Sequence, residues 1–346
     1  MQLDKIFRTA VQYKASDIYI TTGSKPVLRI NGDLILIEEH EVFTKKVAEE
    51  YLLEILNEEQ KKYFAKNLDL DFSLDIPSIA RFRVNIFVQR KGISAAFRLI
   101  PEAVYSIDEL GLPEVLKQIS REKNGLVIVT GPTGSGKSTT LAAMVNEVNE
   151  TSANHIITIE DPIEFVHQNK KSIIEQREVK SHTLSFERAL RSALREDPDV
   201  ILVGEMRDLE TISLAITAAE TGHLVFATLH TSGAAKSIDR MIDAFPFEQQ
   251  NQIRSQLAES LTAVIWQNLV KTKDGKGRIA PLEIMINNSA IANMIRKNKT
   301  HQVDSAIETG FKEGMQTMKK SVSDLLDADL ITEETALDCI PEEIEA

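Results

Sequence analysis

The chain has 346 residues, of which 42% are hydrophobic and 27% charged, with a net charge of −12 and a single cysteine, Cys339. This composition is ordinary for a globular protein of two or three domains, and it excludes intramolecular disulfides and cysteine-rich zinc sites. The acidic balance disfavours a nucleic-acid binder, and no apolar run approaches the roughly 18 residues of a membrane span.

Residues 1–100 predict a small domain of mixed helices and strands. Apolar residues recur at helical spacing in residues 1–14, namely at Leu3, Ile6, Phe7, Ala10 and Val11. Short alternating stretches predict strands at 16–23, 25–32, 33–39, 70–76, 81–92 and 93–101. Residues 47–66 have an apolar face and charged i,i+4 pairs, which predicts one long helix.

The pattern changes after residue 100. Residues 101–112 are interrupted by Pro and Gly and predict a linker. Residues 113–286 contain short apolar strands that alternate with helices, which predicts a parallel sheet covered by helices on both faces. Residues 287–346 have a helical pattern and end in a solvated acidic tail.

A phosphate-binding loop follows the strand near residue 125. The sequence from Gly131 to Ser138 fits G-x-x-x-x-G-K-[ST], with an apolar strand before it and a helix after it. In this pattern backbone N–H groups surround phosphates, Lys137 carries charge to the β- and γ-phosphates, and the Ser138 hydroxyl can bind Mg²⁺. The predicted nucleotide-binding residues are Gly131, Pro132, Thr133, Gly134, Ser135, Gly136, Lys137, Ser138 and Thr139.

An acid follows each of two later strands. Glu205 comes after the apolar run 200–203 and one glycine, and the carboxyl ends of parallel strands are where ligands bind. We therefore expect Glu205 to act on Mg²⁺ or on its water. The strand at 156–159 delivers Glu160, Asp161 and Glu164 to the same edge, where a carboxylate can orient the attacking water. Spacing does not decide which of these three points inward.

Two histidines and three arginines are further candidates. His223 and His230 flank one apolar strand, about 20 Å apart at 3.3 Å per residue, so they cannot readily share a zinc ion. His230, at the carboxyl end, is placed to sense the γ-phosphate. Arg81, Arg83 and Arg98 stand on adjacent predicted strands. They are either surface charge on a sheet or arginine fingers delivered to another subunit.

Taken together, these stretches resemble the secretion ATPase superfamily, and within it the type IV pilus retraction ATPases of the PilT type. The resemblance spans nearly the whole chain. It rests on ASDIYI, RFRVNIF, GPTGSGKST, ITIEDPIEF, DPDVILVGEMRD, TGHLVFATLHT, AFPFEQQNQIRSQLAESL and GMQTMKKSVSDLLDADLITEETAL, in that order.

The resemblance implies a PAS-like N-terminal domain, a RecA-like P-loop ATPase domain and a ring of six subunits that binds ATP and Mg²⁺. It assigns Glu205 to an atypical Walker B motif, Glu164 to a second catalytic carboxylate, and Arg83 and Arg98 to phosphate. His223 and His230 match the family's paired histidines. The implied setting is cytoplasmic, at the inner face of the membrane. The implied partners are a PilC-like platform protein and other pilus ATPases, with no nucleic acid.

Two positions depart from the family pattern. Tyr19 stands where the first motif usually has His. In the motif at Ala290–Arg296, which is tied to retraction rather than hydrolysis, Ala292 replaces the first Arg. ATP hydrolysis is therefore expected, and the direction of pilus movement is left open.

Three alternatives stay open. A pilus-assembly or type II secretion ATPase would usually carry four zinc-binding cysteines and a longer N-terminal region. A companion factor would bind ATP with little hydrolysis of its own. A nucleic-acid motor would show salt-dependent DNA binding.

Overall fold

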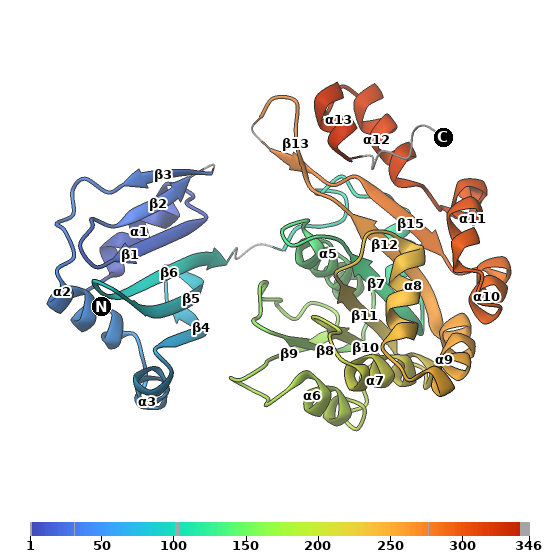
Figure 1. Cartoon of the computed structure of the whole chain (residues 1–346), viewed down its shortest axis with the longest axis horizontal. Helices are drawn as coiled ribbons and strands as arrows, with labels where there is room; N and C mark the ends of the chain where they lie inside the picture. The colour runs from blue at the N-terminus through green and yellow to red at the C-terminus, as the bar shows by residue number, and fades with distance from the viewer. Residues whose placement is uncertain (1, 31, 101–103, 276, 340–346) are drawn as a thin grey trace. The chain divides into compact units, whose positions relative to one another are not determined.

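The computed structural model describes residues 2–30, 32–100, 104–275 and 277–339. The chain divides into two compact units, residues 1–103 and 104–346, each with its own hydrophobic core (Figure 1). The fold is α/β, and its larger sheet is mixed but mainly parallel. Of the linker predicted at 101–112, residues 101–103 lie outside the described residues, as does the predicted acidic tail.

The described residues of unit 1 form a six-stranded antiparallel sheet with three helices. The strands have the order β3-β2-β1-β6-β5-β4. They are β1 Asp17–Thr21, β2 Val27–Ile30, β3 Asp33–Leu36, β4 Asp69–Ile76, β5 Ala80–Gln89 and β6 Gly92–Ile100. All six predicted strands are thereby confirmed. The core of the unit includes Phe7, Phe82 and Phe97, whose rings contact one another.

The helices of unit 1 correct two details. In α1 (Asp4–Gln12) the side chains of Ile6, Phe7 and Ala10 are buried as expected, but Val11 is exposed. The single helix predicted over 47–66 is wrong, because the structure has α2 (Lys45–Glu54) and α3 (Glu58–Asn67). Asn57 begins α3 with a capping box to Gln60, and this Asn-x-x-Gln pattern was the sequence signal for the break.

Unit 2 contains a seven-stranded sheet of order β15-β12-β7-β11-β10-β8-β9. Its strands are β7 Gly125–Thr130, β8 His155–Glu160, β9 Ile173–Glu178, β10 Val200–Val203, β11 Leu224–Leu229, β12 Leu261–Gln267 and β15 Leu282–Ile286. Every neighbouring pair is parallel except β12 and β15. The predicted parallel strands are confirmed, whereas β9 and β12 were not predicted. β13 (Val270–Lys271) and β14 (Arg278–Ile279) form a separate hairpin.

Helices cover both faces of this sheet, as predicted (Figure 1). α4 (Val115–Ser120) and α5 (Lys137–Thr151) share a core with one face, and Ile107 and Leu112 are buried in the same core. On the other face lie α6 Phe186–Ala193, α7 Leu209–Glu220, α8 Ala234–Asp243, α9 Phe247–Ser260, α10 Ser289–Arg296 and α11 Val303–Thr309. α12 (Met318–Asp327) and α13 (Glu333–Cys339) pack around Trp266.

The two departures from the family motifs have local structural settings. The Tyr19 hydroxyl accepts a hydrogen bond from Arg29 Nε at 3.1 Å, and the guanidinium of Arg29 lies 5.5 Å from the centre of the Tyr19 ring. Ala292 lies on α10 and is buried in the core that this helix shares with the sheet.

Candidate nucleotide-binding site

The loop between β7 and α5 has the backbone of a phosphate cradle. Gly131, Gly134 and Gly136 have φ values of +147°, +81° and +87°. A Cβ on Gly131 would lie 2.2 Å from the Gln267 carbonyl oxygen, so only glycine fits there. The loop brings its backbone amides to the N-terminus of the 15-residue helix α5, an arrangement that attracts phosphate.

Lys137 holds its ammonium inside this loop. Its Nζ donates hydrogen bonds to the carbonyls of Gly131 at 2.8 Å and Pro132 at 2.9 Å. Burial lowers the pKa of Lys137, while the charges of Glu205 and Glu164 act to raise it. Both predicted carboxylates therefore lie within electrostatic reach of the P-loop lysine.

The loop is braced by residues that no sequence motif predicts. Gln267, at the end of β12, donates a hydrogen bond from Nε2 to the Ser135 carbonyl at 2.5 Å. Thr130 at the end of β7 accepts the Thr231 amide on Oγ1 at 2.9 Å, which ties the loop after His230 to the P-loop strand. No local motif marks these residues, because their partners lie more than 100 positions away in the sequence.

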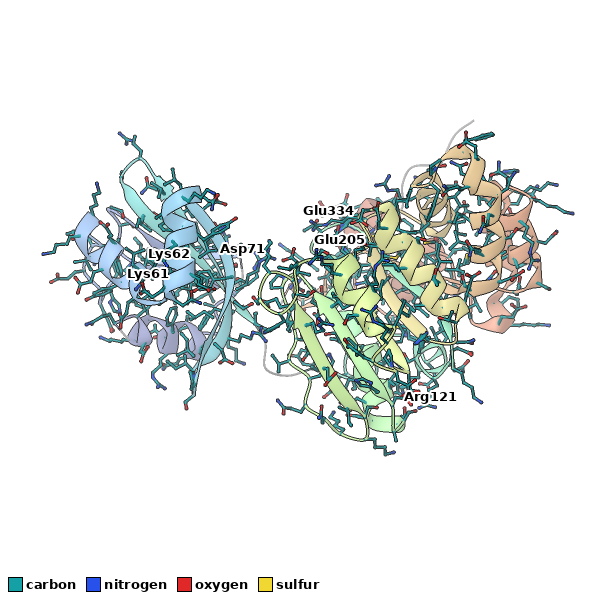
Figure 2. The ribbon with its side chains drawn as sticks, turned by 90° about the horizontal axis from the view of Figure 1, so that it is seen from below. Lys61, Lys62, Asp71, Arg121, Glu205 and Glu334 are labelled. Carbon is teal, nitrogen blue, oxygen red and sulfur yellow. The ribbon has the colours of Figure 1, made fainter. Side chains whose placement is uncertain are left out.

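Gly204 explains why an extra residue separates β10 from Glu205. Its amide donates to the Ile159 carbonyl at 2.8 Å, which continues the pairing of β10 with β8. A Cβ at this position would lie 3.0 Å from that carbonyl oxygen and 3.3 Å from Glu160 Cα. Glycine thus allows the chain to stay against β8 before it turns, and Glu205 follows as a half-buried side chain at the sheet edge (Figure 2).

Glu205 lies between two basic side chains. Arg207 Nη2 is 2.6 Å from Oε2, and His230 Nε2 is 3.3 Å from Oε1. Burial raises the pKa of Glu205, but the hydrogen bond from Arg207 and the charges of Arg207, His230 and Lys137 bring it below its ordinary value. The carboxylate is therefore kept ionised. Arg207 was not anticipated from the sequence, although it follows the acid by two residues.

The three acids after β8 differ in their surroundings. Glu160 accepts hydrogen bonds on Oε1 from Thr158 Oγ1 at 2.7 Å and Gln176 Nε2 at 3.2 Å, and burial raises its pKa to about 7. Asp161 Oδ1 lies 3.6 Å from Lys180 Nζ. Glu164 is exposed, and its charge acts on Lys137. Of the three acids, Glu164 is the one whose charge, like that of Glu205, acts to raise the pKa of Lys137.

The predicted histidines occupy different places. His230 is at the carboxyl end of β11 beside Glu205, whereas His223 is at the opposite end of this strand. There His223 Nδ1 lies 2.9 Å from the Ala218 carbonyl, at the end of α7. The structure therefore does not bring His223 to the P-loop edge.

The predicted arginines belong to unit 1. Arg81 and Arg83 lie on β5, and Arg98 lies on β6 directly opposite Arg83 in the ladder. Arg83 Nη2 is 2.8 Å from Asp71 Oδ2, and Arg98 Nε is 3.0 Å from Asp17 Oδ1. Arg83 and Arg98 thus each have an acidic partner within unit 1.

Mg²⁺ fits the donors at this edge. Ser138 on the first turn of α5 offers a hydroxyl and Glu205 a carboxylate, and both are hard oxygen donors. Within the described residues, no group of three or more His, Cys, Asp and Glu side chains could hold a metal ion. The protein oxygens would therefore act together with phosphate oxygens and water, which is the usual mode for Mg²⁺.

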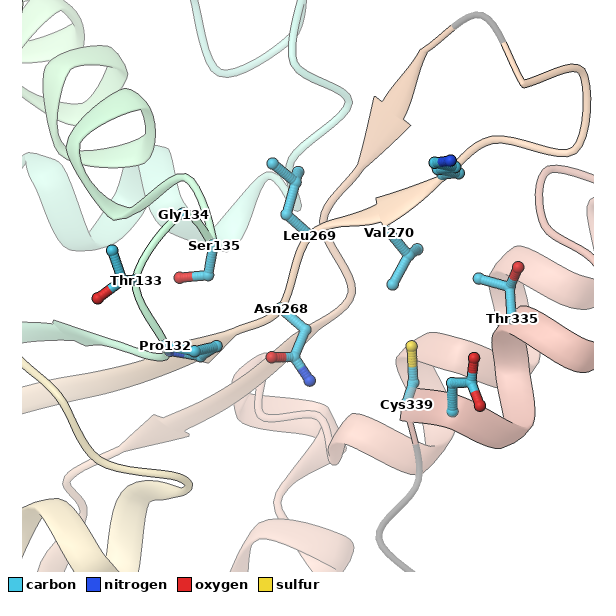
Figure 3. Close-up of a pocket in the computed structure, with 11 residues that line it drawn as sticks. Pro132, Thr133, Gly134, Ser135, Asn268, Leu269, Val270, Thr335 and Cys339 are labelled. Carbon is cyan, nitrogen blue, oxygen red and sulfur yellow. The ribbon is translucent and has the colours of Figure 1, made fainter. Parts of the chain in front are cut away.

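A cavity of about 430 Å³ adjoins the P-loop on the side of β13 (Figure 3). Residues 132–135 form one wall, residues 268–271 another, and Thr335, Asp338 and Cys339 of α13 a third. The cysteine is free and buried, and burial raises the pKa of its thiol. None of the helices in the described part of the chain is both long enough and apolar enough to cross a membrane.

The chain is similar to secretion and pilus proteins in its family model, in its sequence and in its structure. The family model described as "Type II/IV secretion system protein" matches residues 1–335. A twitching motility protein of Neisseria gonorrhoeae is 54% identical over 93% of this chain and 88% of its own length. The "Type IV pilus retractation ATPase PilT" of Pseudomonas aeruginosa is 52% identical over 97% of each chain. The crystal structure of a pilus retraction motor, PilT with bound ADP, matches with a TM-score of 0.92 and 44% identity, over 98% of this chain and 97% of that one.

Proposed function

The chain belongs to the type II/IV secretion system protein family, and from this premise we propose that it is a motor ATPase that couples ATP hydrolysis to the retraction of type IV pili. The observation that carries the ATPase proposal is the P-loop at the N-terminus of α5, with Glu205 and Glu164 both within electrostatic reach of its Lys137. The similarity to a twitching motility protein and to a pilus retraction ATPase supports the choice of pilus retraction.

In this proposal the P-loop holds the phosphates of ATP. Backbone amides of residues 131–139 face the phosphates, and the Lys137 ammonium leaves the carbonyls of Gly131 and Pro132 to contact phosphate oxygens. Bound Mg²⁺, held by Ser138 and reached by Glu205 directly or through water, would withdraw charge from the phosphates. The cavity beside Pro132–Ser135 offers room for the nucleoside end of the molecule.

The two carboxylates have different tasks. We assign Glu164 to orienting or deprotonating the attacking water, because it is exposed and acts on Lys137. Glu205 acts as the Walker B acid, and its position between Arg207 and His230 keeps it ionised. His230 would then contact the γ-phosphate, and its presence or loss would change the position of the loop that follows β11.

The remaining assignments concern the assembly. We assign unit 1 to a PAS-like domain and residues 113–286 of unit 2 to a RecA-like ATPase core, followed by a C-terminal helical region. We assign the working form to a homohexamer at the inner face of the cytoplasmic membrane. Arg83 and Arg98 would exchange their aspartate partners for phosphate oxygens of a neighbouring subunit's nucleotide. Nucleotide-dependent movement of the two units about residues 101–112 would drive a PilC-like platform protein.

The test is the steady-state ATPase rate of the purified full-length protein as a function of its concentration, with the oligomer mass measured in parallel. A rate per subunit that rises with hexamer formation is the expected result. A hexamer that binds ATP without turnover would favour the companion-factor alternative. Restoration of twitching in cells lacking their retraction ATPase separates retraction from pilus assembly, because an assembly ATPase would leave those cells unable to twitch.

A further inference from the structure

Gln176 on the edge strand β9 is hydrogen-bonded to the segment that carries Glu164. Its Nε2 donates to the Phe165 carbonyl at 2.8 Å and to Glu160 Oε1 at 3.2 Å. Its Oε1 accepts the amide of His167 at 2.8 Å. Both N–H groups and the carbonyl of the Gln176 side chain therefore form hydrogen bonds with residues of the segment 160–167.

Glu178, two residues further along β9, holds the other side of Glu164. Its carboxylate accepts the amide of Ile163 at 3.1 Å and the hydroxyl of Ser181 at 2.9 Å, and only 3% of the residue is exposed. Alternate residues of a strand face the same side, so Gln176 and Glu178 reach the segment together. They contact main-chain atoms of the residues immediately before and after Glu164.

The chain that follows this segment is tied to the P-loop helix. Asn149 on α5 is fully buried, donates from Nδ2 to the Gln168 carbonyl at 2.8 Å and accepts the Lys170 amide at 3.0 Å. Ile163 and Phe165 are buried while Glu164 between them is exposed. The side chain of Glu164 is therefore directed by a main chain that is fixed to β9 on both sides of it, and the chain that follows is fixed to α5.

We infer that Gln176 and Glu178 are positioning residues for the reaction, which hold Glu164 at the P-loop without touching the nucleotide. This inference rests on the proposed function, because it assumes that Glu164 acts on the attacking water. A carboxylate that orients water must stay within a fraction of an ångström of its working position, and displacements of about 1 Å cost on the order of 100-fold in rate. A merely structural role would instead lower stability and nucleotide affinity together.

The test compares Gln176→Met with Glu175→Met in the full-length protein. Methionine has a similar length and makes none of the three hydrogen bonds. Glu175 is the adjacent residue on the opposite face of β9, where it contacts His155, so its variant controls for the substitution itself. We expect Gln176→Met to lower kcat about 10- to 100-fold, with ADP affinity and hexamer mass unchanged. Glu175→Met is expected to keep the parent kcat.

Amide hydrogen exchange supplies a readout that does not need turnover. In Gln176→Met, exchange should accelerate at residues 163–167 and stay unchanged at residues 131–139. If Gln176→Met does not fold, the isosteric Gln176→Glu serves instead, since it removes both donors and keeps the acceptor for His167.

Three results would overturn the inference. The first is an unchanged kcat in the Gln176 variant, and the second is equal losses of kcat and ADP affinity. The third is unchanged exchange at residues 163–167. Failure of the proposed function would look different, because the parent protein itself would not hydrolyse ATP. In that case the hydrogen-exchange measurement would still show whether Gln176 on β9 holds residues 163–167.

Discussion

Nε2 of His230 lies 3.3 Å from Oε1 of Glu205, while Arg207 Nη2 lies 2.6 Å from the other carboxylate oxygen. Both oxygens of Glu205, the proposed Walker B acid, therefore have a basic side chain of the protein beside them. In the proposed mechanism, Glu205 would give up one of these contacts to act on Mg²⁺ or on its water. The three side chains lie together at the carboxyl ends of β10 and β11, next to the P-loop.

Glu205→Gln should separate binding from hydrolysis. The amide keeps the shape but loses the charge, so we expect kcat to fall about 100-fold or more, the scale for loss of an electrostatic or acid–base group. ADP binding, measured by calorimetry, should persist. Lys137→Ala is the opposite control and should lose binding. Near-normal turnover of Glu205→Gln would exclude the Walker B role.

Arg207→Gln should change the pH dependence of hydrolysis. Burial raises the pKa of Glu205, and the contact with Arg207 lowers it again. Without the guanidinium the pKa of the carboxyl rises, so Glu205 becomes protonated at a higher pH. The acid limb of the kcat/KM profile should therefore move to higher pH. An acid limb that stays in place or moves to lower pH would mean that Glu205 is not the group that titrates.

Glu160→Gln should remove a pH dependence of stability. Burial raises the pKa of Glu160 from 4.5 to about 7. The stability associated with its neutral form is therefore fully present below pH 4.5 and is lost as the pH rises through 7. Gln stays neutral and can still accept from Thr158 and Gln176. The Tm of the variant minus that of the parent should be larger at pH 8 than at pH 5. A constant difference would contradict this.

Gly204→Ala tests the turn before Glu205. The added Cβ would lie 3.0 Å from the Ile159 carbonyl oxygen, so β8 and β10 must shift apart. We expect the free energy of unfolding to fall by about 1–3 kcal/mol, the usual cost of overpacking, together with a loss of kcat. Gly277→Ala is the matched control, because there the added Cβ would be 3.4 Å from Thr272 Oγ1, an ordinary contact. Equal stabilities of the two variants would show that the turn tolerates a side chain.

Arg83→Ala tests the assignment of an arginine to a neighbouring subunit. Its removal should leave ADP binding by a dilute, dissociated subunit intact and lower the rate of the hexamer 10-fold or more, in line with arginine fingers. Arg191→Ala removes an exposed arginine that is paired with Glu187 on α6 and should have no effect. Comparable rates of the Arg83 and Arg191 variants at hexamer-forming concentrations would refute the role.

The sequence by itself determined the elements and motifs whose signals are local. Short windows of sequence are enough to predict the P-loop, the strand at 200–203 with Glu205 after it, and the strand–helix alternation of unit 2. The reason is that periodicity and glycine spacing are properties of neighbouring residues. The break between α2 and α3 belongs to the same class. Its capping box stands within four residues, although the long apolar pattern hid it.

Only the tertiary structure decided which of these groups meet. Gln267 braces the P-loop from 132 residues away, and Gln176 reaches the segment of Glu164 from a strand too polar to be recognised. His223 and His230 look equivalent in sequence, but they lie at opposite ends of β11, and only His230 lies beside Glu205. The physical reason is that sheet order and crossover connections bring distant strand ends together. Burial and neighbouring charges then set the pKa of each carboxyl group, so that Glu205 is ionised while Glu160 stays neutral up to about pH 7.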